Sequence, residues 1–226
     1  MKYLKLFAVM AIAGGSLAAS GQTTTNINFS ANQPVPDGNP VGLTLSTNLS
    51  ISGGEISSLT LSINVSGGFN GDLYAYLVGP NGGYAVLLNR SGVGTGNSFG
   101  YADTGYNITF DDLAASGVHF YQGGSYTINA FGQLTGTWRP DGENLNPLSA
   151  PSAFDSQTQN ALLGSFDGTD PSGTWTLFFA DLSPGAQSTL VSWSLNITTV
   201  PEPSALALAG LGFAAAAVFM RKRTKL

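Results

Sequence analysis

The chain of 226 residues contains no cysteine and a single histidine, His119. Without cysteine the protein forms no disulfide, so the burial of apolar side chains must hold its fold together. Zinc sites built from Cys and His ligands are excluded for the same reason. Cysteine nucleophiles are excluded as well, and a serine nucleophile would have His119 as its one histidine base.

Basic side chains are scarce in the body of the chain, residues 21–199. Of the eight Lys and Arg residues only Arg90 and Arg139 lie there, whereas all acidic residues except Glu202 do. Two basic against twelve acidic side chains leave the body at about −10, while the whole chain carries −5. Such a body repels nucleic acid and anionic surfaces, and it attracts divalent cations. We therefore expect no nucleic-acid partner.

The N-terminus has the pattern of a secretory signal peptide. Two lysines precede the apolar stretch Leu6–Leu17, and small residues suited to cleavage follow it. This order of charge, apolar core and small residues predicts a signal peptide over residues 1–20 and an exported protein. An uncleaved N-terminal anchor is the alternative.

The C-terminus has three parts in a fixed order. They are the motif Val200, Pro201, Glu202, Pro203, Ser204, then an apolar run over 205–220, then a basic end over 221–226 that begins with Arg221, Lys222, Arg223. As a helix the run would reach about 24 Å, a short span for a hydrocarbon core of about 30 Å. We predict a transmembrane helix stopped by the basic cluster on the cytoplasmic side. A helix packed on the core is the alternative, but the run is apolar on all faces.

The body alternates apolar and polar residues with period two. Such stretches, or continuously apolar ones bounded by Gly and Pro turns, occupy residues 43–51, 59–65, 72–78, 84–88, 106–110, 126–128, 174–180 and 191–197. Period two predicts strands with one buried face. The body should therefore be an all-β, antiparallel, jelly-roll-like β-sandwich of about eight strands. Residues 132–160 show no clear strand and are expected to form a long loop.

The tail resembles the PEP-CTERM sorting signal of Gram-negative bacteria, on the strength of the motif 200–204, the apolar run and the basic end. The resemblance implies that an exosortase, a membrane cysteine protease, processes the tail. It also implies export to the cell surface or extracellular matrix, in association with exopolysaccharide or biofilm material.

The body resembles the P domain, or Homo B domain, of subtilisin-like proprotein convertases. The matching blocks occur in order: FNGDLYAYLVGPNG over 69–82, VLLNRSG over 86–92, then the shorter blocks 110–112, 162–168, 173–177, 180–181 and 192–195. The resemblance implies a β-sandwich over residues 21–199. In that family the domain accompanies a catalytic domain, and no segment here resembles one. We therefore expect no enzyme activity from this chain.

Two kinds of site are suggested by single residues. Asp72 and Asp112 are candidate ligands for Ca²⁺, a hard cation that prefers oxygen ligands and is available outside the cell. Capping of turns is the alternative role for both. Trp138 and Arg139 form the one basic and aromatic pair and are a candidate contact site.

Two further motifs have simpler explanations. Residues 96–100 read GNSFG and match the G-x-S-x-G string, but they lie in a Gly- and Ser-rich loop without the strand and helix that the nucleophile elbow needs. His119, beside Phe120 and Tyr121, is expected at the edge of a strand. A sugar-stacking platform could be formed by Tyr74, Tyr76, Tyr101, Tyr121 and Trp138, although core positions are the alternative.

The sequence thus predicts a non-enzymatic, surface-directed β-sandwich for binding or structure. Two other functions stay open. One is an accessory P domain that acts on a separate secreted subtilisin-like protease. The other is a module that binds extracellular polysaccharide.

Overall fold

The computed structural model describes residues 21–156 and 158–201, and all of these except Gly21 belong to one compact unit, Gln22–Glu202. The predicted signal peptide, the transmembrane segment 205–220 and the basic end lie outside the described residues. Of the sorting motif, Val200 and Pro201 lie inside them. Within this part of the chain, no helix has both the length and the apolar character needed to cross a membrane.

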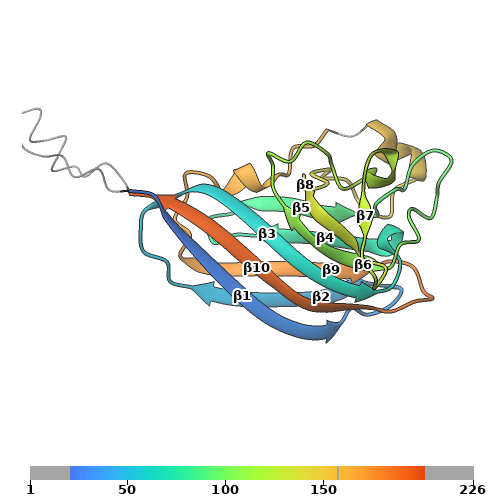
Figure 1. Ribbon diagram of the computed structural model, residues 1–226, viewed down its shortest axis with the longest axis horizontal. Coiled ribbons are helices and arrows are strands. Elements are labelled where there is room, and N and C mark those ends of the chain that lie inside the picture. Colours follow the sequence, from blue (N-terminus) through green and yellow to red (C-terminus); the bar gives the residue numbers. More distant parts are fainter. Residues whose placement is uncertain (1–20, 157, 202–226) are drawn as a thin grey trace, which may run out of the picture. The chain divides into compact units, whose positions relative to one another are not determined.

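The described residues form two β-sheets that pack as a sandwich (Figure 1). The strands are β1 (Thr23–Pro34), β2 (Asn39–Leu49), β3 (Glu55–Gly67), β4 (Leu73–Val78), β5 (Tyr84–Asn89), β6 (Gly105–Phe110), β7 (Thr127–Ile128), β8 (Leu134–Trp138), β9 (Gly173–Asp181) and β10 (Ser188–Val200). The larger sheet has the order β1-β10-β3-β6-β8-β7, and the smaller one has the order β2-β9-β4-β5. Four short 3₁₀ helices lie between strands: η1 (Asn70–Asp72), η2 (Tyr121–Gly123), η3 (Pro151–Ser156) and η4 (Leu163–Phe166).

The core lies between the two sheets, and the period-two pattern explains which residues enter it. In β4, Leu73, Ala75 and Leu77 are fully buried, while the tyrosines between them are half-buried on the other face. Trp175 of β9 and Trp193 of β10 both belong to the core, as the alternation predicts. The indole Nε1 of Trp175 donates to the carbonyl of Pro171 at 2.8 Å, so its one polar group is satisfied.

The β-sandwich expected from the sequence is confirmed, and each of the eight predicted segments overlaps a strand. Two strands were not predicted, β1 and β8. The expectation of a fully antiparallel fold is wrong at one place, because β8 pairs with β6 in parallel register. The expected loop over 132–160 is likewise wrong where it contains β8 and η3. β8 reads LTGTW, and its central glycine and two threonines hide the apolar alternation.

Candidate functional site

A polar cavity of about 460 Å³ opens at the end of β8. Its walls include His119, Phe120 and Tyr121 from the segment between β6 and β7, Trp138 and Arg139 at the end of β8, and Glu143 from the segment that follows. The predicted contact pair Trp138 and Arg139 therefore lies beside the single histidine. Nothing in the residue pattern predicted that these side chains lie close together.

Backbone hydrogen bonds bring these segments together. Arg139 donates its N–H to the carbonyl of Ser116 at 2.8 Å, and Val118 donates to the carbonyl of Arg139 at 3.0 Å. The parallel pairing of β6 and β8 thus continues briefly beyond both strands. The next residues turn back over β5, where Asp141 donates its N–H to Leu87 at 3.1 Å. This turn places Asp141 beside the segment that carries His119.

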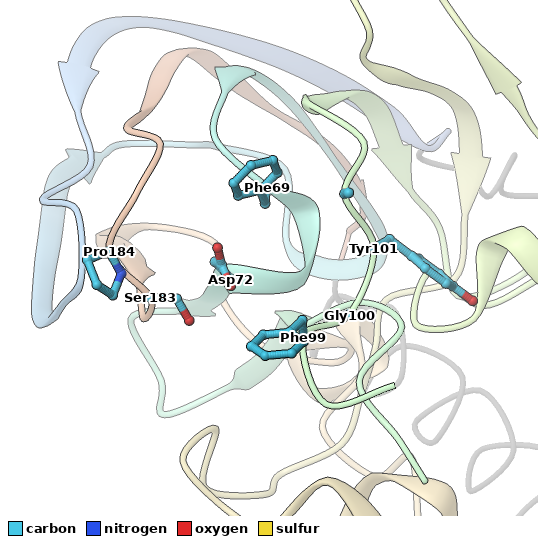
Figure 2. Close-up of a pocket in the computed structure, with 8 residues that line it drawn as sticks. Phe69, Asp72, Phe99, Gly100, Tyr101, Ser183 and Pro184 are labelled. Carbon is cyan, nitrogen blue, oxygen red and sulfur yellow. The ribbon is translucent and has the colours of Figure 1, made fainter. Parts of the chain in front are cut away.

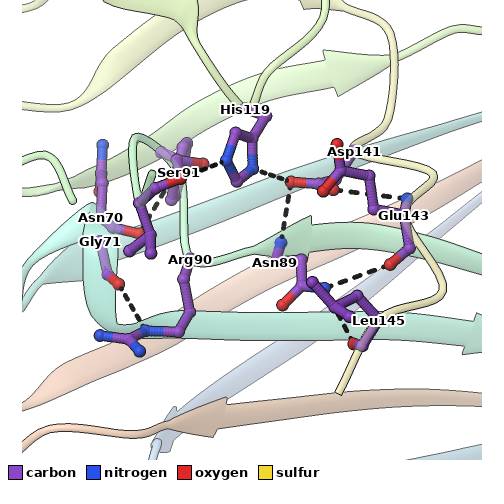
Figure 3. Close-up of polar contacts among 11 residues, drawn as sticks. Asn70, Gly71, Asn89, Arg90, Ser91, His119, Asp141, Glu143 and Leu145 are labelled. Atoms are coloured by element: carbon purple, nitrogen blue, oxygen red, sulfur yellow. Dashed lines mark hydrogen bonds and ion pairs between the residues drawn. The ribbon is translucent and has the colours of Figure 1, made fainter. Parts of the chain in front are cut away.

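His119 and Asp141 form a buried pair (Figure 3). The imidazole Nδ1 lies 2.7 Å from Oδ2 of Asp141, and Nε2 lies 2.9 Å from the carbonyl oxygen of Val93. A carbonyl only accepts hydrogen bonds, so Nε2 carries a proton. Asp141 is fixed in turn by the backbone N–H groups of Asn89 and Glu143, at 3.2 and 3.4 Å. The expectation that His119 lies at a strand edge is wrong, because it is buried in a turn between β6 and η2.

Glu143 completes a group of three ionisable side chains. Its side chain is 5% exposed, and its Oε2 has no hydrogen-bond partner among the described residues. One ligand atom each from His119, Asp141 and Glu143 lies within 4.8 Å of the others. This buried group could hold a metal ion.

The charges of the group perturb one another. Burial alone would lower the pKa of His119, but the hydrogen bond and the charge of Asp141 outweigh it, so that the pKa is raised. Burial, together with the charge of Asp141, raises the pKa of Glu143 to about 7. Both shifts favour the protonated form of the side chain concerned.

The indole of Trp138 is less accessible than a contact site requires. The residue is 5% exposed, and its Nε1 donates to the carbonyl of Thr135 at 3.0 Å. Arg139 is half-buried at the cavity wall, and its Nε has no partner among the described residues. Arg139 is therefore the more available member of the pair, and a contact role for either residue stays a prediction.

Asp72 lies in a second cavity, of about 500 Å³, with mostly apolar walls (Figure 2). Phe69, Phe99 and Pro184 line it together with Asp72. Burial raises the pKa of Asp72. A neighbouring carboxyl group, that of Asp181 on β9, is buried, and its Oδ1 has no partner within the described part of the chain.

Asp112 has a clear structural role. Its carboxylate accepts the backbone N–H groups of Leu163 and Gly164, at 3.1 and 2.6 Å, and so binds the first turn of η4. It lines a different cavity from that of Asp72. The structure does not bring the two candidate calcium ligands into one site, and calcium binding at either stays a prediction.

Four aromatic side chains share the outer face of the smaller sheet: Tyr74 and Tyr76 of β4, Tyr84 of β5 and Phe178 of β9. The rings of Tyr76 and Phe178 stack with centroids 4.7 Å apart and planes inclined by 15°. The hydroxyl groups of Tyr74 and Tyr84 lie 3.1 Å apart. All four are half-buried, so part of each ring faces solvent. We call this group the aromatic face.

The other aromatic candidates lie elsewhere. Tyr121 and Trp138 are buried, and Tyr101 lines the cavity of Asp72. The G-x-S-x-G string over 96–100 lies in the segment between β5 and β6, without the strand and helix of a nucleophile elbow around it. Tyr74 and Tyr76 are thus the two predicted platform residues that the structure places together on one surface.

Comparison with known proteins identifies the C-terminus. The family of the PEP-CTERM protein-sorting motif matches residues 199–223. The chain therefore carries a PEP-CTERM sorting signal, which implies export, sorting to the cell surface and processing by an exosortase. No curated protein matches the chain.

Among solved structures, the body is similar to a region of the serine protease of Aeromonas sobria. One structure is the protease with its chaperone, at 15% identity and a TM-score of 0.43, and the other is the protease described by itself, at 16% and 0.41. The matches cover 80% and 79% of this chain. They cover 27% of each protease chain, so the chain spans about a quarter of the protein that it matches.

Proposed function

We propose that this protein is an exported, surface- or matrix-directed binding module with a jelly-roll-like body and no enzyme activity of its own. The observation that carries the proposal is the junction between body and tail. The matched sorting motif begins at residue 199, inside β10, which ends at Val200. The last core strand thus runs directly into the sorting signal, so sorting the tail also sorts the folded body.

Localisation tests the sorting part of this proposal. The full chain, produced in a Gram-negative host with an exosortase, should appear in the surface or matrix fraction with a shortened tail. A variant with Pro201, Glu202 and Pro203 all changed to alanine should keep the full tail and remain with the membrane. Equal fractionation and equal size of the two proteins would overturn the assignment.

Two observations support binding rather than catalysis. Both ring nitrogens of His119 are already engaged, by Asp141 and by the carbonyl of Val93. The nearby Ser91 is buried, and its hydroxyl bonds to that of Tyr106 at 2.9 Å. A serine nucleophile needs its hydroxyl against a free imidazole nitrogen. Hydrolysis of peptide or glycan substrates by the purified chain, abolished by His119→Gln, would contradict this.

The aromatic face favours polysaccharide as the ligand. Half-buried rings on the outer face of a sheet offer apolar area to the faces of sugar rings. The same sheet also carries a pair of hydroxyl groups: Ser46 Oγ and Thr176 Oγ1 lie 2.9 Å apart on neighbouring strands. None of the side chains named on this face is charged, whereas the body as a whole is strongly acidic. A neutral polysaccharide therefore suits it better than an anionic one.

Affinity electrophoresis of the full chain in gels containing a neutral glucan tests this ligand. Tyr76→Ala should weaken retention by about three- to tenfold, the loss of roughly one aromatic contact. Phe131→Ala is the matched control, because Phe131 is 83% exposed outside the aromatic face. Unretarded migration of the wild type would remove this ligand class. Capture of a subtilisin-like protease instead would favour the accessory-domain function.

A further inference from the structure

The buried group of His119, Asp141 and Glu143 is not used by the proposed binding function. It lies in the wall of the polar cavity and has features that a structural hydrogen-bond network does not require. Chief among them is Glu143, whose Oε2 is buried without a partner among the described residues. An unpaired buried carboxylate oxygen costs free energy unless something compensates it. A bound cation would supply that compensation.

The imidazole is oriented as a metal ligand would be. Its Nε2–H donates to the carbonyl of Val93 at 2.9 Å, which directs Nδ1 toward the carboxylates. Metal-ligating histidines usually donate their second ring N–H to a carbonyl or carboxylate in this way. Asp141 is held in turn by two backbone N–H groups. Two of the three donors are therefore fixed by their surroundings.

We propose that this group binds a first-row transition-metal dication such as Zn²⁺, through Nδ1 of His119 and one carboxylate oxygen each of Asp141 and Glu143. The three donor atoms lie within 4.8 Å of one another, so small side-chain movements bring them around one ion. When the ion enters, the proton between His119 and Asp141 passes to solvent, as does any proton carried by Glu143. The complex of Zn²⁺ with two carboxylates and a neutral imidazole then has no net charge.

The donor set selects the metal. One imidazole nitrogen and two carboxylate oxygens match a zinc site with three protein ligands, whose fourth position holds water. Calcium takes six to eight oxygen ligands, more than this group offers. Glu143 also lines the polar cavity, which provides both an entry path and room for that water.

The test uses the full-length chain, stripped with chelator and then dialysed against Zn²⁺, with metal counted per chain. We expect one Zn²⁺ per wild-type chain and at least a tenfold weaker affinity in Glu143→Gln. The matched control is Glu55→Gln, since Glu55 is exposed at the start of β3. The control should bind as the wild type does. Undiminished binding in Glu143→Gln, or equal displacement by Ca²⁺ at the same concentration, overturns the proposal.

A second measurement keeps the proposal falsifiable if the variant does not fold. The X-ray absorption spectrum of the wild-type zinc complex should show one imidazole nitrogen among oxygen ligands. A coordination shell of oxygen alone would place the ion elsewhere and overturn the assignment. The aromatic face contains none of these ligands, so its polysaccharide test can fail without affecting this one.

Discussion

Nδ1 of His119 and Oδ2 of Asp141 lie 2.7 Å apart, and both side chains are buried, that of Asp141 completely. Each partner compensates the other for the loss of water. Removing one partner leaves the other buried and unpaired. This lowers the free energy of unfolding far more than replacing both partners with apolar residues would.

Asp141→Ala should therefore destabilise the fold by about 3–5 kcal/mol. The change also removes the acceptor of the N–H groups of Asn89 and Glu143. Urea unfolding monitored by tryptophan fluorescence measures the difference. Glu55→Ala, at an exposed position, should change stability by no more than about 0.5 kcal/mol. A loss below about 1 kcal/mol for Asp141→Ala would mean that the pair contributes little.

Asp181 should make stability depend on pH. Burial, and then the charges of Asp72 and Asp37, raises its pKa to about 6 from a usual 3.8. The folded state thus binds the proton more tightly than the unfolded state. This contribution to stability is fully present below about pH 3.8 and is lost as the pH rises to about 6.

Asp181→Asn mimics the protonated carboxyl group, so it should remove this slope. Above pH 6 the variant should be the more stable protein, by roughly 1–2 kcal/mol once screening by water in the adjoining cavity is allowed for. Unfolding curves from pH 4 to 8 provide the comparison. Curves for variant and wild type that stay parallel across this range would contradict the assignment of the slope to Asp181.

Calcium binding near Asp72 can be separated from zinc binding. If Ca²⁺ binds beside the carboxyl groups of Asp72 and Asp181, millimolar Ca²⁺ should raise the Tm of the full chain by mass action. Asp72→Asn should abolish the rise, while Glu143→Gln should keep it. A Tm that does not change with Ca²⁺ would exclude calcium binding at Asp72, one of the two candidate ligands predicted from the sequence.

The pattern of residues predicted the sheets better than it predicted the site. Period-two alternation reflects burial on one face, and it located β4 and β10 because alternate residues of these strands enter the core. β8 was not predicted because Gly136 stands at its centre, between two threonines, and interrupts the alternation of apolar and polar residues. Its parallel pairing with β6 depends on a connection of more than twenty residues, whose course no local pattern specifies.

The buried ionisable group depends on that same connection. His119 comes from one loop, whereas Asp141 and Glu143 come from another. The pairing beyond β6 and β8, together with the turn over β5, makes them neighbours. The absence of cysteine excluded zinc sites of the Cys/His type. It did not exclude a site of one histidine and two carboxylates. The one available signal was the close spacing of Asp141 and Glu143, which is common in turns.

Strand β1 provides the last prediction. It lies at the edge of the larger sheet and pairs with β10 alone, and its residues are largely polar. Phe29 attaches it to the core, since its ring stacks on that of Trp193 with centroids 4.1 Å apart and planes inclined by 21°. Phe29→Ala should cost about 2–3 kcal/mol, less than the 3–5 kcal/mol expected for a fully buried aromatic residue, because Phe29 is half-buried.

Hydrogen exchange would show which strands lose stability in this variant. Backbone amides of β1 should lose protection in Phe29→Ala while those of β3 and β6 keep it, because the lost contact holds the edge strand and not the centre of the sheet. Trp175→Ala, in the other sheet, is the contrasting variant and should lower protection across the whole body. Uniform loss of protection in Phe29→Ala would instead mean that β1 folds as part of one cooperative unit with the core.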